Sequence, residues 1–215
     1  MTPNESSPPT VIVGLVAEAR VAGVLNWPVS IGGGNYEGAV AAAERAVRAG
    51  ARALISFGLA GGLDPVLHPG TLLLPTEVLT DDRRIPTDVS LRIRLGSGLP
   101  APLLGVRTTV ATAAAKHVLF TTTGAAALDL ESGAVARIAQ AHDLPFAVLR
   151  AICDPADRDL PAAALIALDH HGAIGFGRVI ASIIAQPRQL PTLLRLARDA
   201  DTARQSLHSA AKNIR

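Results

Sequence analysis

The chain has 215 residues and a formal net charge of +2, and 49% of its residues are apolar while only 3% are aromatic. A chain of this length can bury a sizeable core as one α/β domain built on Ala, Leu and Val, and so small a charge imbalance gives no indication of a nucleic-acid partner. The single cysteine, Cys153, excludes an internal disulfide.

Residues 1–9 are polar and rich in proline, which predicts a disordered N-terminus, and residues 10–215 show no linker or repeat that would divide them. The start of the chain lacks the apolar segment of a signal peptide, and no apolar run reaches the ~18–20 residues that a membrane span needs. We therefore expect a single-domain cytoplasmic protein, with peripheral contact to a membrane left open.

The first predicted strand covers Thr10–Val16, and Glu18 follows just past its end. An acid at this place has two interpretations. It is favoured in the first turn of a helix by the helix dipole, and it also lies at the carboxyl end of a strand, where ligands bind in α/β sheets.

Gly32, Gly33 and Gly34 predict a turn, and a helix over 37–49 ends at Gly50. The next buried strand, 53–57, is closed by the small residues of 58–63. Ala60, Gly61 and Gly62 in this segment predict either a plain turn or a loop whose backbone N–H groups approach an anion.

Residues 64–75 contain a turn with His68, which we expect on the surface, and a strand over 71–74. Residues 77–94 are polar and mixed, and Asp81, Asp82, Arg83 and Arg84 within them predict a solvated loop or an interface rather than a metal site. A strand over 103–110 and a short helix over 111–120 follow.

The most informative stretch is 125–158, which has the pattern of strand, helix, strand and loop. Apolar residues 126–130 form the first strand, 132–142 have helical spacing, and 146–153 form an apolar run typical of a strand buried on both faces. Glu131 and Asp154 each follow one of these strands. Since ligands bind at the carboxyl ends of strands in open sheets, both carboxylates are candidates for one site.

The acids at 157 and 159 alternate with Arg158, which predicts a loop with ion pairs rather than a metal site. His170 and His171 are adjacent and cannot act as an i, i+4 ligand pair, so we expect a helix end there. The segment 189–212 is an amphipathic helix. Its apolar face suits the core or a dimer interface, and the alternative is a lid or a membrane-surface contact.

Two elements of this sequence resemble the nucleoside phosphorylase and nucleosidase superfamily. They are Leu130-Glu131-Ser132 and the run RAICDPAD at 150–157, which are similar to the paired motifs of methylthioadenosine/S-adenosylhomocysteine nucleosidases. The segments VGLVAEARVAG, FGLAGGLDP and QLPTLLRLARDA resemble the hopanoid-associated phosphorylases within that superfamily. The resemblance implies an α/β fold of three α/β/α layers with a central mixed, mostly parallel sheet.

The resemblance also implies roles for the acids. Asp154 would donate a proton to N7 of the leaving purine, Glu131 would bind the ribose hydroxyls, and Glu18 would orient the attacking water or phosphate. A free aspartic acid has a pKa of ~3.9, so Asp154 can act as a donor only if burial or the bound base raises that value.

Leu130 would pack on the ribose, and Ala60, Gly61 and Gly62 would line the nucleophile pocket. This chain has Leu59 where relatives have serine, and Ser56 where some phosphorylases have an arginine that binds phosphate. Phosphate is thus an open co-substrate, and neither a cofactor nor a metal is expected. Superfamily members are usually oligomers, so we expect a homo-oligomer.

The resulting hypothesis is cleavage of the N-glycosidic bond of a 5′-substituted adenosine. The resemblance points to adenosylhopane in hopanoid biosynthesis, with release of adenine and formation of ribosylhopane or its 1-phosphate. The alternatives are a general methylthioadenosine/S-adenosylhomocysteine nucleosidase and a nucleoside-binding protein without turnover. A dinucleotide-dependent oxidoreductase is disfavoured, because the first strand is followed by a single glycine, Gly14.

Overall fold

The computed structural model of the protein describes residues 8–161, 164 and 190–214. The expected helix end at His170 and His171 lies outside these residues, as does most of the N-terminal segment 1–9. The fold is therefore built here from residues 8–161 and the final helix.

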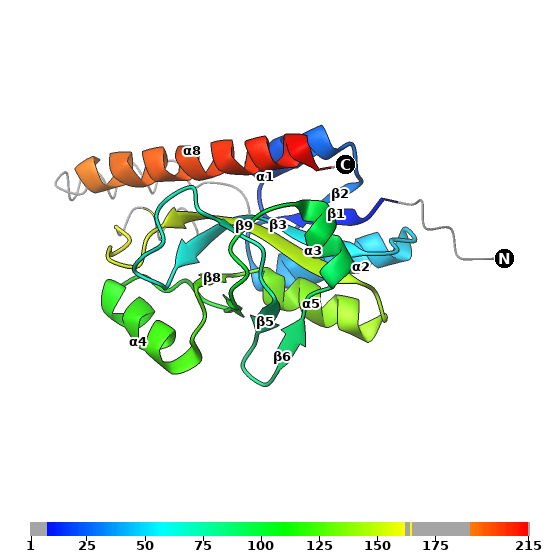
Figure 1. Cartoon of the computed structure of the whole chain (residues 1–215), viewed down its shortest axis with the longest axis horizontal. Coiled ribbons are helices and arrows are strands. Elements are labelled where there is room, and N and C mark those ends of the chain that lie inside the picture. The colour runs from blue at the N-terminus through cyan, green and yellow to red at the C-terminus, as the bar shows by residue number, and fades with distance from the viewer. Residues whose placement is uncertain (1–7, 162–163, 165–189, 215) are drawn as a thin grey trace.

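A single sheet forms the centre of the molecule (Figure 1). Its strands are β1 (Thr10–Val13), β2 (Val29–Ile31), β3 (Leu54–Gly62), β4 (Leu72–Leu73), β5 (Glu77–Leu79), β6 (Arg84–Pro86), β7 (Leu103–Gly105), β8 (Ala127–Asp129) and β9 (Phe146–Asp154). The two nine-residue strands β3 and β9 lie side by side and parallel in the middle. Both are buried over almost their whole length, which explains their continuous apolar sequences.

The other edge of β3 pairs with two strands in succession. Its first half pairs in parallel with β1, and its last residues, Gly61 and Gly62, pair antiparallel with β8. Beyond these, β2 continues from β1, and β7, β5 and β6 continue from β8. The sheet is thus mixed and mostly parallel, as the family resemblance implied.

Helices cover both faces of the sheet, which gives the expected three layers (Figure 1). The helices are α1 (Val16–Ala22), α2 (Tyr36–Arg48), α3 (Val89–Leu95), α4 (Ala113–Thr123), α5 (Ser132–Ala141) and α8 (Leu190–Asn213), with a short 3-10 helix η1 (Gly23–Leu25). The apolar faces of α2 and α5 bury one side of the sheet, and α1 and α8 bury the other. None of the described helices combines the length and the hydropathy that a membrane crossing requires.

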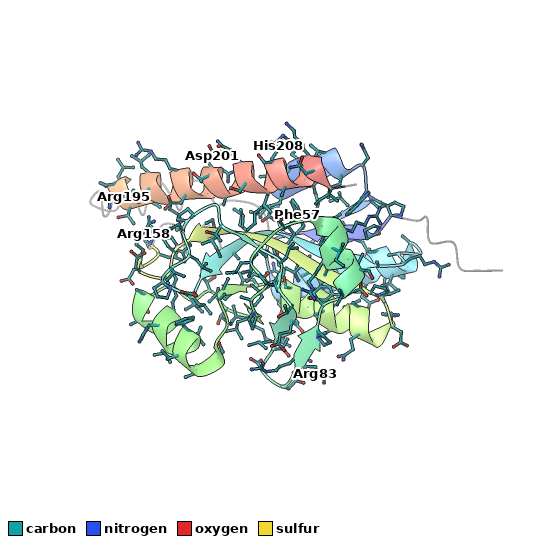
Figure 2. All side chains as sticks on the ribbon, viewed as in Figure 1. Phe57, Arg83, Arg158, Arg195, Asp201 and His208 are labelled. Atoms are coloured by element: carbon teal, nitrogen blue, oxygen red, sulfur yellow. The ribbon has the colours of Figure 1, made fainter. Side chains whose placement is uncertain are left out.

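The final helix α8 lies over the central strands, close to the extent predicted for it. Ala203, Leu207 and Ala211 are buried in the same core cluster as Phe57 of β3 and Leu149 of β9. Figure 2 shows Phe57 directly beneath α8. The helix begins away from this contact, because Leu190 and Leu194 are about half exposed.

Four segments differ from the local structure that the sequence predicted. The first strand ends at Val13 instead of Val16, because α1 begins at Val16. The segment 77–94, in which no strand or helix was predicted, contains the antiparallel hairpin β5–β6 and α3, and the loop predicted at 81–84 forms the turn of this hairpin up to the start of β6 at Arg84. Residues 58–62, expected to be a turn or loop, continue β3 to Gly62. The strand expected over 103–110 also stops early, at Gly105.

Candidate active site

Arg150 is the centre of a buried polar cluster, although it lies in the apolar strand β9. Its side chain has no exposed surface, and it forms ion pairs with two acids near the start of α5. Nη2 lies 2.9 Å from Glu131 Oε2, and Nε lies 2.6 Å from Asp129 Oδ2 at an angle too bent for a hydrogen bond. Burying a guanidinium without such partners would be very costly, so these contacts are needed for the strand to form.

Two serine hydroxyls complete the contacts around Arg150. Nη2 donates to Ser56 Oγ at 2.7 Å and to Ser132 Oγ at 3.3 Å. Ser132 in turn donates to Asp129 Oδ2 at 2.5 Å. The same aspartate accepts the backbone N–H groups of 131 and 132 on its other oxygen, which caps the first turn of α5. These bonds fix the position at which Glu131 leaves the sheet.

Glu18 reaches the same cluster from α1. One carboxylate oxygen accepts the N–H groups of Gly14 and Leu15 at 3.0 and 2.9 Å, and the other accepts the N–H of Leu59 at 2.9 Å. A Cβ added to Gly58 would lie 2.4 Å from Glu18 Oε1 and 2.5 Å from Arg150 Nη1, so both side chains meet against this glycine. Glu18 thus joins the turn after β1 to the middle of β3.

The charges of this cluster do not balance, because three carboxylates surround one guanidinium. Burial, opposed by Arg150 and reinforced by Glu18 and Asp129, raises the pKa of Glu131 to about 7. Burial lowers the pKa of Arg150, but the three carboxylates more than offset this and raise it above its usual value. The cluster therefore carries a cation at any ordinary pH and an acid that is partly protonated near neutrality.

Glu131 is also the acid that reaches towards the turn after β1. A Cβ added to Gly14 would lie only 1.8 Å from Glu131 Oε1, so this turn can approach the carboxylate only with glycine at 14. Glu131 is 7% exposed and Glu18 is 5% exposed. Both are therefore almost buried, and Glu131 keeps a small accessible surface through which a ligand could bind it.

Asp154 lies four residues beyond Arg150 along β9 and is held by a different cation. Its Oδ2 accepts a hydrogen bond at 2.6 Å from Nζ of Lys116 in α4. Burial raises the pKa of Asp154, while Lys116 and Arg158 oppose this rise. Asp154 is 8% exposed, so it combines a raised pKa with a small opening to solvent.

A bulge in β9 determines how Asp154 leaves the sheet. Ala60 of β3 is paired with Ile152 but Gly61 is paired with Asp154, which leaves Cys153 as the extra residue. Such bulges re-aim side chains at the ends of strands. A Cβ added to Gly61 would lie 3.7 Å from Asp154 Oδ2 and 3.5 Å from the Leu128 side chain, so the acid, Gly61 and β8 share one neighbourhood.

The direction of β8 changes the sequence-based picture of this site. Glu131 and Asp154 were expected at the matching ends of parallel strands, but β8 is antiparallel to β3. Glu131 consequently lies level with the middle of β3, beside Arg150, while Asp154 lies at its end. Along β9, Asp154 lies four residues beyond Arg150, which is about 13 Å of strand.

The glycine segment also differs from the prediction. Ala60, Gly61 and Gly62 are part of β3 and pair with neighbouring strands instead of forming a free anion-binding loop. Ala60 is buried in the core, and Gly61 lies next to Asp154. Leu130 is half-buried between β8 and Glu131, and His68 is exposed in its turn.

Two important residues were missed by sequence analysis. Arg150 was noticed only as part of a motif, although a single charge within the apolar run FAVLRAIC requires buried partners. Lys116 had a weaker signal: it shares a helix face with Leu119 and Phe120, the partly buried apolar residues of α4. A lysine at this position is more often solvent-exposed, so only the fold reveals its contact with Asp154.

No cluster of three or more His, Cys, Asp or Glu side chains that could hold a metal ion occurs within residues 8–161, 164 and 190–214. The acids around Arg150 are bound to nitrogen donors on nearly every side. The arrangement can instead do two things: hold polar hydroxyl groups at Glu131 and supply a proton from Asp154.

Comparison with known proteins gives a consistent result. A sequence model of the family described as the phosphorylase superfamily matches residues 10–103 and 100–185. No curated protein sequence matches the chain. Futalosine hydrolase of Helicobacter pylori strain 26695 is similar in structure with a TM-score of 0.68 and 16% identity, covering 96% of this chain and 98% of that chain.

Two nucleosidases with bound inhibitors or analogues have similar structures. The 5′-methylthioadenosine/S-adenosylhomocysteine nucleosidase from Neisseria meningitidis, in complex with methylthio-immucillin-A, has a TM-score of 0.66 and 15% identity over 95% of this chain and 98% of its own. The S-adenosylhomocysteine nucleosidase from Streptococcus pyogenes, in complex with 5-methylthiotubericidin, has a TM-score of 0.68 and 13% identity over 99% of this chain and 100% of its own. At these identities the likeness establishes a shared fold.

Proposed function

The chain belongs to the phosphorylase superfamily, and on that basis we propose that it cleaves the N-glycosidic bond of a 5′-substituted adenosine and releases adenine. The observation that carries the proposal is a pair of nearly buried acids, Asp154 at the end of β9 and Glu131 at the start of α5. Asp154 and Glu131 both have raised pKa values, and each is held in place by its own cation.

The proposed reaction begins with the departing base. Breaking the bond to C1′ places negative charge on the purine, and protonation at N7 lets it leave as a neutral molecule. Asp154 would donate this proton, because burial favours its neutral, donating form. Leu130 would pack against the sugar near the reacting carbon.

Glu131 would bind the ribose at the opposite end. Its carboxylate would accept hydrogen bonds from the 2′- and 3′-hydroxyls while Arg150 holds its other side. These bonds strengthen as the ribosyl group becomes positively charged, and this stabilises the transition state more than the bound substrate. The same logic operates in glycoside hydrolysis by paired carboxylates.

Glu18 would orient the nucleophile. It is held by three backbone N–H groups and lies beside Arg150, which leaves a carboxylate next to the ribose-binding acid. We propose that the nucleophile is water. Leu59 offers no side-chain hydrogen bond to phosphate, Ser56 is already bound to Arg150, and Gly61 and Gly62 are engaged in the sheet.

The 5′ group is proposed to be apolar. Leu15, Val16 and Ile31 are 40–57% exposed. Ile31 precedes the glycine segment 32–34, which is hydrogen-bonded to the turn after β1 and lies against the Leu15 side chain. Gly14 of the same turn lies against Glu131, so exposed apolar side chains beside this turn favour a hydrocarbon substituent over a charged one. Adenosylhopane, which the sequence resemblance implies, fits this requirement, and 5′-methylthioadenosine is the smaller alternative.

Purified protein incubated with adenosylhopane, 5′-methylthioadenosine or S-adenosylhomocysteine tests the proposal directly. We expect adenine from at least one of them, fastest from adenosylhopane, at a rate that added phosphate does not change. Chromatographic detection of free adenine is the measurement. No adenine from any substrate contradicts the proposed function, and a rate that requires phosphate contradicts the hydrolytic form of it.

Replacing Glu131 with glutamine should weaken the hydrogen bonds to the ribose hydroxyls in the transition state. The amide can still accept the bond from Arg150. At a pH above about 7, where Glu131 is mostly ionised, the amide replaces a carboxylate with a neutral group and loses the charge that stabilises the transition state. Since hydrogen bonds to a charged group contribute about 1.5–3 kcal/mol, kcat/KM should fall roughly 10- to 150-fold. Steady-state kinetics of adenine release measure this change.

Glu44→Gln is the matched control for Glu131→Gln, because Glu44 is a surface acid of α2 that pairs with Arg48. The control should retain full activity. A Glu131→Gln enzyme with unchanged kcat/KM would exclude Glu131 as the ribose-binding residue.

A further inference from the structure

Lys116 of α4 is fully buried beside Asp154, the proposed proton donor. Its side chain has no exposed surface, and its ammonium donates three hydrogen bonds, to Asp154 Oδ2 at 2.6 Å and to the carbonyls of Pro155 and Arg158 at 3.0 and 2.9 Å. All three N–H groups of the ammonium are therefore used. Two of these bonds hold the backbone that follows the acid, and the third reaches the acid itself.

We propose that Lys116 is a positioning residue for the proton donor, which holds Asp154 in place and stabilises the carboxylate that forms when its proton passes to the purine. This inference rests on the function proposed above. It adds a residue from α4, a helix with no other part in the proposed reaction, and it assigns that residue a role in the chemical step.

The contact between Lys116 and Asp154 should become stronger during the proton transfer. The O–H bond of Asp154 breaks, its electron pair remains on the carboxylate, and the proton bonds to N7 as the bond from the purine to C1′ breaks. Among the described residues, only Lys116 is hydrogen-bonded to the Asp154 carboxylate, and it engages Oδ2, so Oδ1 is left to face the base. The ammonium meets a neutral acid before the transfer and an anion after it, so the attraction grows along the reaction.

A purely structural role explains the contact less well. The start of α4 is already fastened to the same loop, because Ala113 N–H donates to Asp159 at 2.7 Å and Leu160 N–H donates to Ala111 O at 2.7 Å. A fully buried ammonium pays a large desolvation penalty that an apolar side chain would avoid. A buried lysine beside the Asp154 carboxylate is better explained by an effect on the ionisation of Asp154.

Other charged groups also face Asp154 and must be considered. Arg158, in the same loop, is about one-third exposed and pairs with Asp199 of α8 at 2.7 Å. Figure 2 shows Arg158 beneath that helix. Arg158 lowers the pKa of Asp154, and Asp199 raises it, so their effects oppose each other. Lys116 is the larger influence because it is in direct contact and has no solvent around it.

The test is the pH dependence of kcat/KM for adenine release in Lys116→Gln. Glutamine keeps a hydrogen-bond donor but removes the charge. A general acid must be protonated, so activity falls as the pH rises through its pKa. Without the ammonium this pKa rises, and the falling limb should move up by about 1–3 pH units while kcat decreases. The midpoint of a limb does not depend on the amount of folded enzyme.

Two further variants complete the experiment. Lys116→Arg keeps the charge and should keep the wild-type midpoint, and Arg158→Gln removes a more exposed cation and should shift it far less. The proposal is overturned if Lys116→Gln shifts the limb no more than Arg158→Gln, or if Lys116→Arg shifts it as far as Lys116→Gln. These outcomes require an active wild-type enzyme. Absence of adenine release by the wild type contradicts the proposed function instead.

Discussion

Replacing Asp154 with asparagine is expected to abolish adenine release while leaving nucleoside binding nearly unchanged. The amide has the same shape and can accept the bond from Lys116, but it has no acidic proton for N7. General acids contribute about 10²–10⁴-fold to a rate, so kcat should fall by at least that range. Steady-state adenine release measures the rate, and titration with a nucleoside analogue measures binding.

Asp157→Asn provides the matched control, because Asp157 lies in the same loop with an exposed side chain. Its kcat should equal that of the wild type. If the wild type turns over and Asp154→Asn retains more than a tenth of its rate, another group supplies the proton. If the wild type binds nucleosides but neither protein releases adenine, the protein is a nucleoside-binding protein without turnover.

Replacing Arg150 with methionine should cost the protein much of its stability. Methionine fills part of the volume, but it leaves Asp129, Glu131 and Glu18 buried without their cation. Breaking a buried ion pair by removing one partner typically costs 3–5 kcal/mol, and here a single cation serves three carboxylates. The free energy of unfolding should therefore fall by at least about 3–5 kcal/mol, which is a large part of the roughly 5–15 kcal/mol that is typical of native proteins.

Urea unfolding followed by circular dichroism measures this loss. Arg84→Met is the matched control, since Arg84 forms an ion pair with Glu77 at 2.9 Å with its own side chain 65% exposed. Exposed pairs of this kind contribute about 0–1 kcal/mol. Equal stability losses in the two variants would show that the Arg150 cluster has no special structural importance.

The strands and helices with strong periodicity were predictable from the sequence. The apolar runs of β3 and β9 and the 3.6-residue spacing of α2 and α5 identify those elements, and their alternation predicts a layered α/β fold. The candidate acids were also predictable, because Glu131 and Asp154 lie next to such elements.

Other features depend on contacts that the sequence does not contain. The β5–β6 hairpin has strands of only three residues each and a polar turn, and it is stabilised by neighbours such as Arg137, which pairs with Asp82 at that turn. Figure 2 shows Arg83 at the tip of this hairpin. The antiparallel direction of β8 is a property of the whole sheet, and no local pattern in ALD predicts it.

The position of α8 at the end of the chain has a consequence for folding during synthesis on the ribosome. Roughly 60 residues separate the end of β9 from the end of α8, and translation at ~5–20 residues per second takes about 3–12 s to add them. During that interval Ala203, Leu207 and Ala211 are not yet in place in the core cluster that they share with β3 and β9, although local collapse takes far less than a second. Nascent chains should therefore expose an apolar surface that chaperones can bind until α8 has been synthesised.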